Sequence, residues 1–315
     1  MPNLIVPGGQ KCGSSALAYY LSLHPDCFLS TPKEPSFFSR DQNLKDMAAY
    51  GRHFRGGERA KILFEASTGY LFESYVPDRI RRTLLPEKPD LKCLIVLRRP
   101  VDRAISSFLH LKKRLDDRRH IVEVFENPPP EAKDLFAAEE RRIKEAMAGD
   151  LIDVGRYRNR YDDWLWQFRY LRNSWYTDFV RAYRDMLGPG QLKIIFSEDL
   201  RATPDQTTRA VFDFLDLSPF DHAEFANPVN PTLLPRGMDV FKRTKTGRAD
   251  WFLQRYANRI LPRVGKAHVA SAAENKVLGK LKFDLDCVLA KQYSELSDLA
   301  NRDVAEIWPR LKYDE

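Results

Sequence analysis

The stretch that decides the fold is Pro7-Gly8-Gly9-Gln10-Lys11-Cys12-Gly13-Ser14-Ser15, which joins a short apolar run to a helical pattern. Before it, Leu4 to Val6 has the character of a strand, and after it helical spacing continues at Leu17, Tyr20, Leu21 and His24. Glycines let the backbone approach an anion, and the N–H groups and dipole of a helix N-terminus favour negative charge. We expect this turn to bind a phosphate or sulfate group. The alternative is a glycine-rich turn that only opens a helix.

The turn differs from the loop of nucleoside triphosphatases, GxxxxGK[ST], in the residues that handle a γ-phosphate. The two glycines have the required spacing, but Ser14 stands where the lysine belongs and Lys11 comes earlier. A carboxylate that would hold magnesium is also missing from the apolar run Lys92 to Leu97, where Arg98 follows instead. These differences argue against a kinase that uses magnesium and a nucleoside triphosphate.

Short β-type runs alternate with helical stretches along the chain, a pattern typical of a parallel sheet covered by helices. The runs are Leu4 to Val6, Lys61 to Phe64, Lys92 to Leu97 and Leu192 to Phe196. We therefore predict an α/β fold, a central parallel β-sheet flanked by helices, formed by a single domain over residues 1–315. The pattern breaks after Lys112, and we interpret residues 112–150 as an insertion or a mobile lid.

Two later segments are predicted to be helical, and one aromatic run leaves two readings open. Thr203-Pro204-Asp205-Gln206 is typical of a capping box, and the helix after it would bury Val211, Phe214 and Leu215. The C-terminal residues are predicted to be helical up to about Trp308. A run of aromatic residues either lines a ligand groove or packs in the core, which is the commoner case. It consists of Trp164, Trp166, Phe168 and Tyr170.

A second group of candidate anion-binding residues follows the run Lys92 to Leu97. Arg98 leaves the end of a predicted strand, and Pro100 suits the first position of a helix, which places Ser106 two helical turns further on. Both side chains can address one anion at the carboxyl edge of the sheet, where open α/β sheets bind their ligands. With the glycine-rich turn, they predict a ligand that carries two separated anionic groups. The alternative is a solvated helix start with surface ion pairs.

The composition excludes several classes of protein. The 315 residues are 43% hydrophobic and 30% charged, unlike a disordered chain, and no apolar run approaches a membrane span in length. The 4 cysteines form no CxxC pair and the 6 histidines lack ligand spacing, so we expect no disulfide scaffold and no metal. The net charge of +7 suits an anionic ligand, but no nucleic-acid-binding signature accompanies it. Because a strand is predicted from Leu4, with no signal peptide or anchor before it, we expect a cytoplasmic protein.

Taken together, the two segments resemble the sulfotransferases that use 3'-phosphoadenosine 5'-phosphosulfate (PAPS), whose 5'-phosphosulfate loop reads PKxGTT and whose 3'-phosphate segment reads RxPxxRxxSxY. The counterparts are Gln10 to Ser15 and Arg98 to Phe108, with glutamine for proline, serine for threonine and phenylalanine for tyrosine. The resemblance is closest to the carbohydrate-type and bacterial branch, in which a KEPxFF segment such as Lys33 to Phe38 is typical. Further matches, in the expected order along nearly the whole chain, are Ser22 to Pro25, Phe64 to Ser67, Ser197 to Leu200 and the closing helix with Trp308.

The resemblance implies a P-loop-like fold, PAPS as the sulfuryl donor, the desulfated nucleotide PAP as the product, and a role for each matched residue. The 5'-phosphosulfate would be held by Lys11, Cys12, Gly13, Ser14 and Ser15. The 3'-phosphate would be held by Arg98 and Ser106. Glu34 matches the family's general base, and Lys11 is the second catalytic candidate because it can stabilise the charge that develops on the leaving phosphate.

Two departures from the family's pattern bear on the chemistry. Many heparan-type relatives carry a catalytic lysine in an EKxP segment where this chain has Ala66, so Lys33 or Lys11 would have to supply that charge. Those relatives also close the cofactor site with a KGRxHP loop, of which this chain has only Lys245-Thr246-Gly247-Arg248. Glu65, just past a predicted strand end, is the reserve candidate for the base, with a carboxylate paired to a nearby arginine as the alternative.

These observations predict a sulfotransferase that moves the sulfuryl group of PAPS to a hydroxyl of a carbohydrate or another small acceptor by in-line displacement, without a metal. The alternatives are a P-loop nucleotide kinase and a sulfotransferase-like protein that binds a glycan or a nucleotide without turnover. The basic run Lys112 to Arg119 either attracts an anionic acceptor or forms a solvated helix face. We expect neither nucleic acid nor a membrane as a partner.

Overall fold

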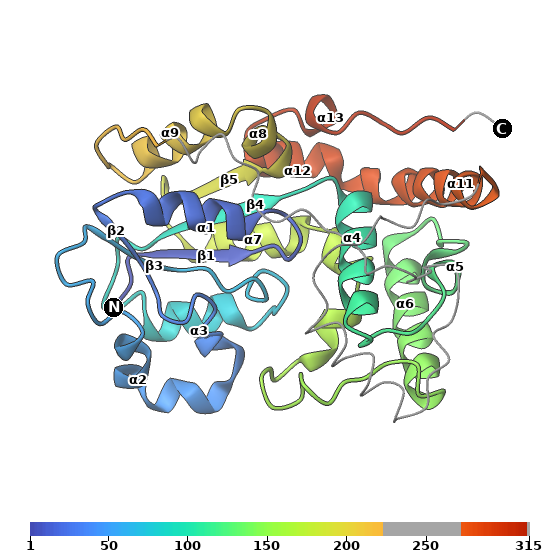
Figure 1. Ribbon diagram of the computed structural model, residues 1–315, viewed down its shortest axis with the longest axis horizontal. Coiled ribbons are helices and arrows are strands. Elements are labelled where there is room, and N and C mark those ends of the chain that lie inside the picture. Colours follow the sequence, from blue (N-terminus) through green and yellow to red (C-terminus); the bar gives the residue numbers. More distant parts are fainter. Residues whose placement is uncertain (223–271, 314–315) are drawn as a thin grey trace, which may run out of the picture.

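A five-stranded, all-parallel sheet forms the centre of the computed structural model, which describes residues 1–222 and 272–313 (Figure 1). The strand order is β2-β3-β1-β4-β5. The strands are β1 (Leu4–Gly8), β2 (Cys27–Leu29), β3 (Ile62–Glu65), β4 (Lys92–Leu97) and β5 (Leu192–Phe196). The predicted α/β fold with a central parallel sheet is therefore confirmed, and the short edge strand β2 is the one strand of this sheet that the sequence did not predict.

Helices connect the strands and cover both faces of the sheet. The α-helices of the first half are α1 (Ser14–Leu23), α2 (Met47–Arg52), α3 (Val76–Thr83), α4 (Pro100–Lys113), α5 (Ile121–Phe125) and α6 (Ala132–Ala148). Those of the second half are α7 (Thr177–Met186), α8 (Ser197–Ala202), α9 (Pro204–Phe214), α11 (Ala272–Leu289), α12 (Tyr293–Ala300) and α13 (Val304–Ile307). Short 3₁₀ helices lie at Phe37–Ser39, Asp41–Lys45, Trp164–Phe168, Arg172–Ser174 and Ala290–Gln292.

The sheet separates two hydrophobic cores, because successive strand residues point to opposite faces. In β4, Leu94 and Val96 join the core beneath α1, α8 and α9, whereas Cys93, Ile95 and Leu97 join the core with α3, α4 and α7. Figure 1 shows α1 and α9 on one side of the sheet and α3 on the other. Burial on both faces explains why β4 is almost uniformly apolar, as is typical of a central parallel strand.

The predicted helix starts are correct at Pro100 and Pro204, but one helix differs in detail. Thr203 does not form the capping box, since its hydroxyl donates to the carbonyl of Asp199. The buried stripe of α9 contains Phe212 in place of Phe214. Thr208, Val211, Phe212 and Leu215 follow the spacing of one helical face, whereas Phe214 lies partly exposed beside it.

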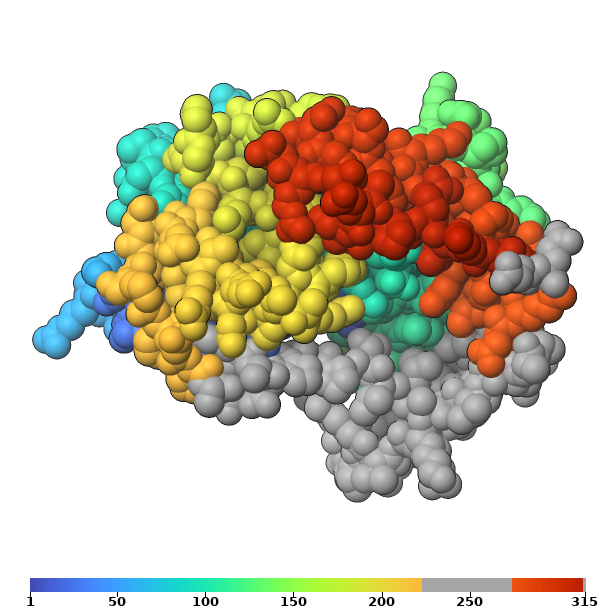
Figure 2. All heavy atoms as spheres, turned by 90° about the horizontal axis from the view of Figure 1, so that it is seen from above, coloured from blue at the N-terminus to red at the C-terminus, as the bar shows by residue number. Residues whose placement is uncertain are grey.

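The C-terminal helices complete the larger core. Trp308 is fully buried, and its ring packs against Phe196 at the end of β5 and against Tyr176 and Tyr293. Figure 2 shows these helices, coloured orange to red, against the yellow part of the chain that contains α7 and β5. The predicted helical C-terminus ending near Trp308 is thus confirmed in the part that the structure describes.

Residues 112–150 contain the end of α4 together with α5 and α6. Their apolar side chains, among them Ile121, Phe125 and Ile143, belong to the larger hydrophobic core. The single-domain organisation over residues 1–315 and the lid function of this segment remain predictions.

The basic run Lys112 to Arg119 contains two buried cations, so both sequence interpretations of it are wrong at these positions. The ammonium of Lys112 donates to the carbonyl of Arg119 at 2.7 Å. The guanidinium of Arg119 donates to both carboxylate oxygens of Asp117, which also accepts the hydroxyl hydrogen of Tyr170. Both cations are bonded inside the protein, Arg119 to a carboxylate and Lys112 to a carbonyl, and they are not presented to an anionic acceptor.

The buried Arg119–Asp117 pair gives a stability prediction. Arg119→Ala is expected to lower the free energy of unfolding by about 3 to 5 kcal/mol, because it leaves the fully buried Asp117 carboxylate without its cation. Urea denaturation measures this change. Lys280→Ala, which removes an exposed ion pair with Asp284, serves as the control and is expected to change stability by about 0.5 kcal/mol or less. Equal losses in the two variants would contradict the assignment.

Candidate active site

The glycine-rich turn between β1 and α1 lies at the carboxyl edge of the sheet. Gly8 has φ of +117°, and a Cβ there would lie 2.5 Å from the carbonyl oxygen of Thr68, so only glycine fits. Gly13 also has a left-handed conformation and caps α1. The amides of Gly13, Ser14 and Ser15 belong to the first turn of α1, where N–H groups have no acceptor within the helix. The turn therefore has left-handed glycines and a helix start, and anion binding by it stays a prediction.

Lys11 is the cation of this turn and carries a strained backbone. Its φ of +68° lies in the left-handed region, which costs a residue other than glycine about 1 to 2 kcal/mol. Burial lowers the pKa of Lys11, and the neighbouring positive charges of Arg98 and Lys113 lower it further. Lys11 has no ion pair with a carboxylate of the described residues. An anion bound at the turn would relieve the repulsion between these cations.

Arg98 lies beside the turn, and the binding of a phosphate by Arg98 and Ser106 stays a prediction. Arg98 follows β4, donates to the carbonyl of Lys11 at 3.4 Å, and has a buried Nε without an acceptor among the described residues. Ser106 is buried on α4. His110 and Lys113 follow it at helical spacing, and both interact electrostatically with Lys11. This stripe of α4 therefore faces the turn.

His110 and Lys113, which follow Ser106 on this stripe of α4, were not among the site residues predicted from the sequence. Burial lowers the pKa of His110 to about 3, with contributions from Lys11, Arg114 and Lys113, so its imidazole is neutral at pH 7. The spacing of His110 and Lys113 from Ser106 was the available signal. Lys113 extends the positive region around the glycine-rich turn, and His110 adds a neutral imidazole beside it.

Cys12 has a structural position, unlike the other residues predicted to hold the phosphosulfate. Its Sγ points inward to the carbonyl of Gln10 and the hydroxyl of Tyr176, and its N–H donates to the carbonyl of Gly9. Next to it, the amide side chain of Gln10 donates to Gln167 at 3.0 Å and accepts from Ser107 at 2.7 Å. Both side chains anchor the turn to the core.

Glu34 lies in the segment after β2 and forms an ion pair with its neighbour. The ammonium of Lys33 lies 2.8 Å from the carboxylate of Glu34, and each side chain is about a third exposed. The same ammonium donates to the carbonyl of Ala66 at 3.4 Å, and the N–H of Ala66 donates back to the carbonyl of Lys33. This segment is thus attached to the carboxyl end of β3, at the edge of the sheet where the other predicted residues lie.

Glu65, the reserve candidate for the base, is fully buried and not paired with an arginine. It accepts hydrogen bonds from Tyr50 at 2.5 Å and Ser67 at 2.6 Å, with Tyr70 at 3.3 Å. Burial raises the pKa of Glu65 to about 7 against the opposing effect of these hydrogen bonds. Its contacts are those of a carboxyl that holds the end of β3 in place.

Several other sequence expectations concern the surroundings of the site. Trp166, Phe168 and Tyr170 are buried in the core, and Trp164 is partly buried against it. The segment Lys245 to Arg248 lies outside the described residues. Within the described ranges, no group of histidine, cysteine and carboxylate side chains could hold a metal ion, and no helix is both long and apolar enough to cross a membrane.

The family model described as the sulfotransferase domain matches residues 1–228. The chain belongs to the sulfotransferase family. The solved structure of a sulfotransferase from Alicyclobacillus acidocaldarius is similar over 97% of this chain and 98% of its own, with a TM-score of 0.56 and 25% identity. Sulfuryl transfer is the reaction class, and the P-loop-like α/β fold the architecture, that these similarities support.

Curated sulfotransferases show how much of this chain is shared with larger proteins. The bifunctional heparan sulfate N-deacetylase/N-sulfotransferase 1 of Caenorhabditis elegans is 25% identical over 225 residues, which are 70% of this chain and 22% of that protein. The bifunctional heparan sulfate N-deacetylase/N-sulfotransferase 2 of Homo sapiens is 26% identical over 227 residues, again 22% of its length. The membrane-associated sulfotransferase kil1 of Dictyostelium discoideum is 22% identical over 307 residues, which are 78% of this chain and 64% of that protein. The chain thus spans about a fifth of the length of the first two relatives.

The buried carboxyl of Glu65 gives the sulfotransferase a pH-dependent contribution to stability. Because its pKa rises from 4.5 to about 7 on folding, the folded state binds more protons between these values, and stability falls as pH rises. Glu65→Gln cannot ionise, so its free energy of unfolding should fall less over this range, by up to about 1.4 kcal/mol per pH unit. Urea denaturation from about pH 5 to pH 8 measures the difference. Parallel pH profiles for the wild type and the variant would show that Glu65 is not a high-pKa carboxyl.

Proposed function

We propose that this sulfotransferase moves a sulfuryl group from PAPS to a hydroxyl of a carbohydrate or another small acceptor. The observation that supports the proposal is a pair of groups suited to anions at one edge of the sheet. One is the turn with Lys11 and the first amides of α1, and the other is Arg98 with Ser106 on α4. The buried Nε of Arg98, which lacks an acceptor among the described residues, fits a ligand oxygen.

PAPS carries an activated sulfuryl group on its 5'-phosphate and a second phosphate at the 3' position. In our proposal, Gly13, Ser14 and Ser15 hold the 5'-phosphosulfate through their amides and hydroxyls, with Lys11 beside them. Arg98 and Ser106 hold the 3'-phosphate. Cys12 lines the turn without contributing its side chain, because its Sγ faces inward.

The division of chemical roles follows from the contacts of each residue. Glu34, which is partly exposed, takes the proton of the acceptor hydroxyl as the acceptor oxygen forms its bond to sulfur. The bond between sulfur and the phosphate oxygen breaks, and the charge that develops on that oxygen is stabilised by Lys11. The buried and fully hydrogen-bonded Glu65 supports the strand end and does not take the proton.

Lys33 is proposed to supply the charge that Ala66 lacks. Its ammonium reaches the backbone carbonyl of Ala66 from the neighbouring segment. A positive charge is therefore present beside the position where heparan-type relatives carry a lysine, although it comes from another part of the sequence. Its ion pair also orients the carboxylate of Glu34.

A P-loop kinase is the less supported alternative. Ser14 occupies the position of the kinase lysine, and Arg98 follows β4 at a position from which a carboxylate would hold magnesium. The cytoplasmic location and the absence of a nucleic-acid partner remain predictions.

The 3'-phosphate assignment predicts a selective loss of binding. Arg98→Ala is expected to weaken the binding free energy of PAP by about 1.5 to 3 kcal/mol, because it removes a charged hydrogen-bond donor. The affinity for AMP, which lacks the 3'-phosphate, should stay nearly unchanged. Titration calorimetry with both nucleotides measures the two affinities. A uniform loss for PAP and AMP would mean that Arg98 supports the fold, and equal affinity of the wild type for both would contradict the 3'-phosphate site.

The assignment of the base predicts a loss of turnover without a loss of nucleotide binding. Glu34→Gln keeps the size of the side chain but cannot take a proton, so turnover should fall by roughly 10²- to 10⁴-fold. Transfer of labelled sulfate from PAPS to a panel of hydroxyl acceptors measures turnover.

Glu65→Gln is the matched control for Glu34→Gln, since both replace a carboxyl by an amide. We expect Glu65→Gln to retain turnover wherever it stays folded. Near-normal turnover of Glu34→Gln together with a loss of turnover in Glu65→Gln would show that Glu65, and not Glu34, is the base.

A further inference from the structure

A guanidinium lies directly on the segment that carries Glu34. Arg160, in the segment between α6 and the 3₁₀ helix Trp164–Phe168, donates through Nη2 to the carbonyl of Glu34 at 3.3 Å and to the hydroxyl of Ser36 at 3.2 Å. Both acceptors are neutral, and the side chain is exposed to solvent. In the ranges 1–222 and 272–313, Arg160 has no carboxylate within ion-pair distance.

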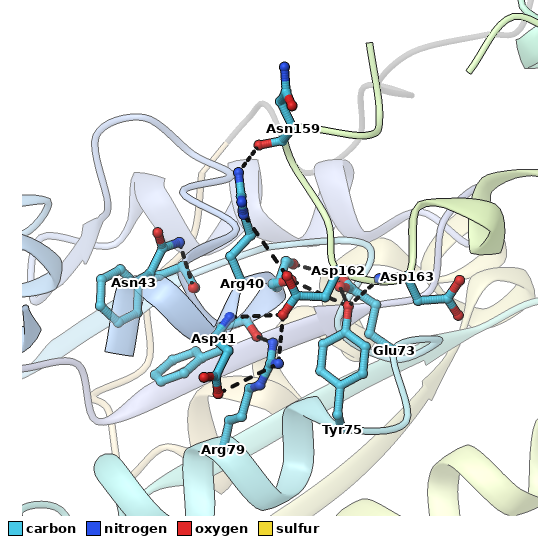
Figure 3. Close-up of polar contacts among 12 residues, drawn as sticks. Arg40, Asp41, Asn43, Glu73, Tyr75, Arg79, Asn159, Asp162 and Asp163 are labelled. Atoms are coloured by element: carbon cyan, nitrogen blue, oxygen red, sulfur yellow. Dashed lines mark hydrogen bonds and ion pairs between the residues drawn. The ribbon is translucent and has the colours of Figure 1, made fainter. Parts of the chain in front are cut away.

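The segment around Arg160 is held rigidly against the Glu34 segment by residues on both sides of it. Upstream, the guanidinium of Arg40 donates to the carbonyl of Asn159 at 2.5 Å. Downstream, the carboxylate of Asp162 accepts from Arg79 at 2.7 Å and from the N–H of Asp41 at 2.8 Å. Figure 3 shows Asp162 between Arg40 and Arg79. Arg160 is thus fixed close to Glu34 before any acceptor binds.

We call these contacts of Asp162 with Arg40, Asp41 and Arg79 the Asp162 clamp. The polar side chains on the core side of the clamp also have hydrogen-bond partners. The carboxyl of the buried Glu73 accepts from Ser39 at 2.8 Å and from Tyr75 at 2.5 Å, and the hydroxyl of Tyr75 accepts from the N–H of Asp163 at 3.2 Å (Figure 3). Arg79 also donates to the carbonyl of Phe38 at 2.9 Å. The clamp therefore joins α3, the Glu34 segment and the Arg160 segment into one unit.

The other arginines around this clamp are paired with carboxylates. Asp162 is neutralised by Arg79 and Arg40, and Asp163 by Arg169. Arg160 has no such partner among the described residues. A guanidinium presents its donors in a planar fork that matches a carboxylate or a sulfate. The guanidinium of Arg160 lies over the ring of Tyr161 and uses Nη2 for its hydrogen bonds to the Glu34 segment, so its other N–H donors are available to a ligand.

We propose that Arg160 binds an oxyanion, a carboxylate or a sulfate group, that the acceptor carries close to its reacting hydroxyl. The proposal rests on the proposed function and deepens it, because it assigns the acceptor to the anionic class. Arg160 is a specificity-determining residue in this account, since it binds a part of the acceptor that does not react. Within the basic run Lys112 to Arg119, Lys112 and Arg119 do not take this role, because both are buried and hydrogen-bonded inside the protein.

The test compares neutral and anionic acceptors of matched shape. Neutral methyl glucoside is compared with two anionic probes, methyl glucuronide and methyl glucoside 6-sulfate. Neutral 4-hydroxyphenylethanol is compared with anionic 4-hydroxyphenylacetate. Binding to the protein saturated with PAP is measured by saturation-transfer NMR titration, and sulfuryl transfer is measured with labelled PAPS. We expect at least one anionic probe to bind about 10- to 100-fold more tightly than its neutral partner, the range for a charged hydrogen-bonded pair. The glucuronide and the 6-sulfate distinguish a carboxylate from a sulfate.

Three variants separate specificity from folding. Arg160→Gln should remove the preference for the anionic probe and leave PAP affinity and the melting temperature unchanged, and Arg160→Lys should retain part of the preference. Arg158→Gln is the matched control, because Arg158 is an exposed arginine of the same segment whose guanidinium packs over Trp164. It should keep the full preference.

The outcomes distinguish this inference from the proposed function. A wild type without preference in any pair, or an equal loss in Arg158→Gln and Arg160→Gln, overturns the role of Arg160. Failure of PAP itself to bind overturns the proposed function instead. If Arg160→Gln lowers the melting temperature and weakens all probes alike, Arg160 is a structural residue.

Discussion

The proposed site depends on two cations, Lys11 and Arg98, that have no ion pair with a carboxylate in residues 1–222 and 272–313. Lys11 and Arg98 meet at the carboxyl edge of a parallel sheet, because β1 and β4 are neighbours and end at that edge. Burial and the charge of Arg98 lower the pKa of Lys11, which shows that the protein alone does not favour this charge. A bound polyanion would stabilise the arrangement. The glycine conformations, the helix start and the stripe on α4 all serve that requirement.

In the proposed function, the predicted residues separate into a donor side and an acceptor side. Lys11, Ser14 and Arg98 belong to the turn and to β4, whereas Glu34 and Lys33 are attached to the end of β3. Transfer of a group between two ligands requires two such sides that face a common space. The Gln10–Ser107 contact anchors the turn, and the Asp162 clamp holds the segment that follows Glu34.

Local sequence signals predicted the elements whose formation depends on local chemistry. Glycine spacing and helical periodicity located the turn and α1, and Pro100 located the start of α4. The strand β2 was missed because three half-buried residues give no period. The burial of Arg119 and the position of Arg160 depend on partners far away in the sequence, such as Tyr170 for Asp117 and Ser36 for Arg160. No local pattern records such contacts.

The most direct test of the account is a crystal structure of the protein with PAP bound. The account predicts that the 5'-phosphate accepts hydrogen bonds from the amides of Gly13 to Ser15, and that the 3'-phosphate lies within hydrogen-bond distance of Arg98 and Ser106. The carboxylate of Glu34 should face the free side of the 5'-phosphate, where the sulfuryl group would be attached. PAP bound with its 3'-phosphate away from Arg98, or with Glu34 on the far side of the nucleotide, would contradict it.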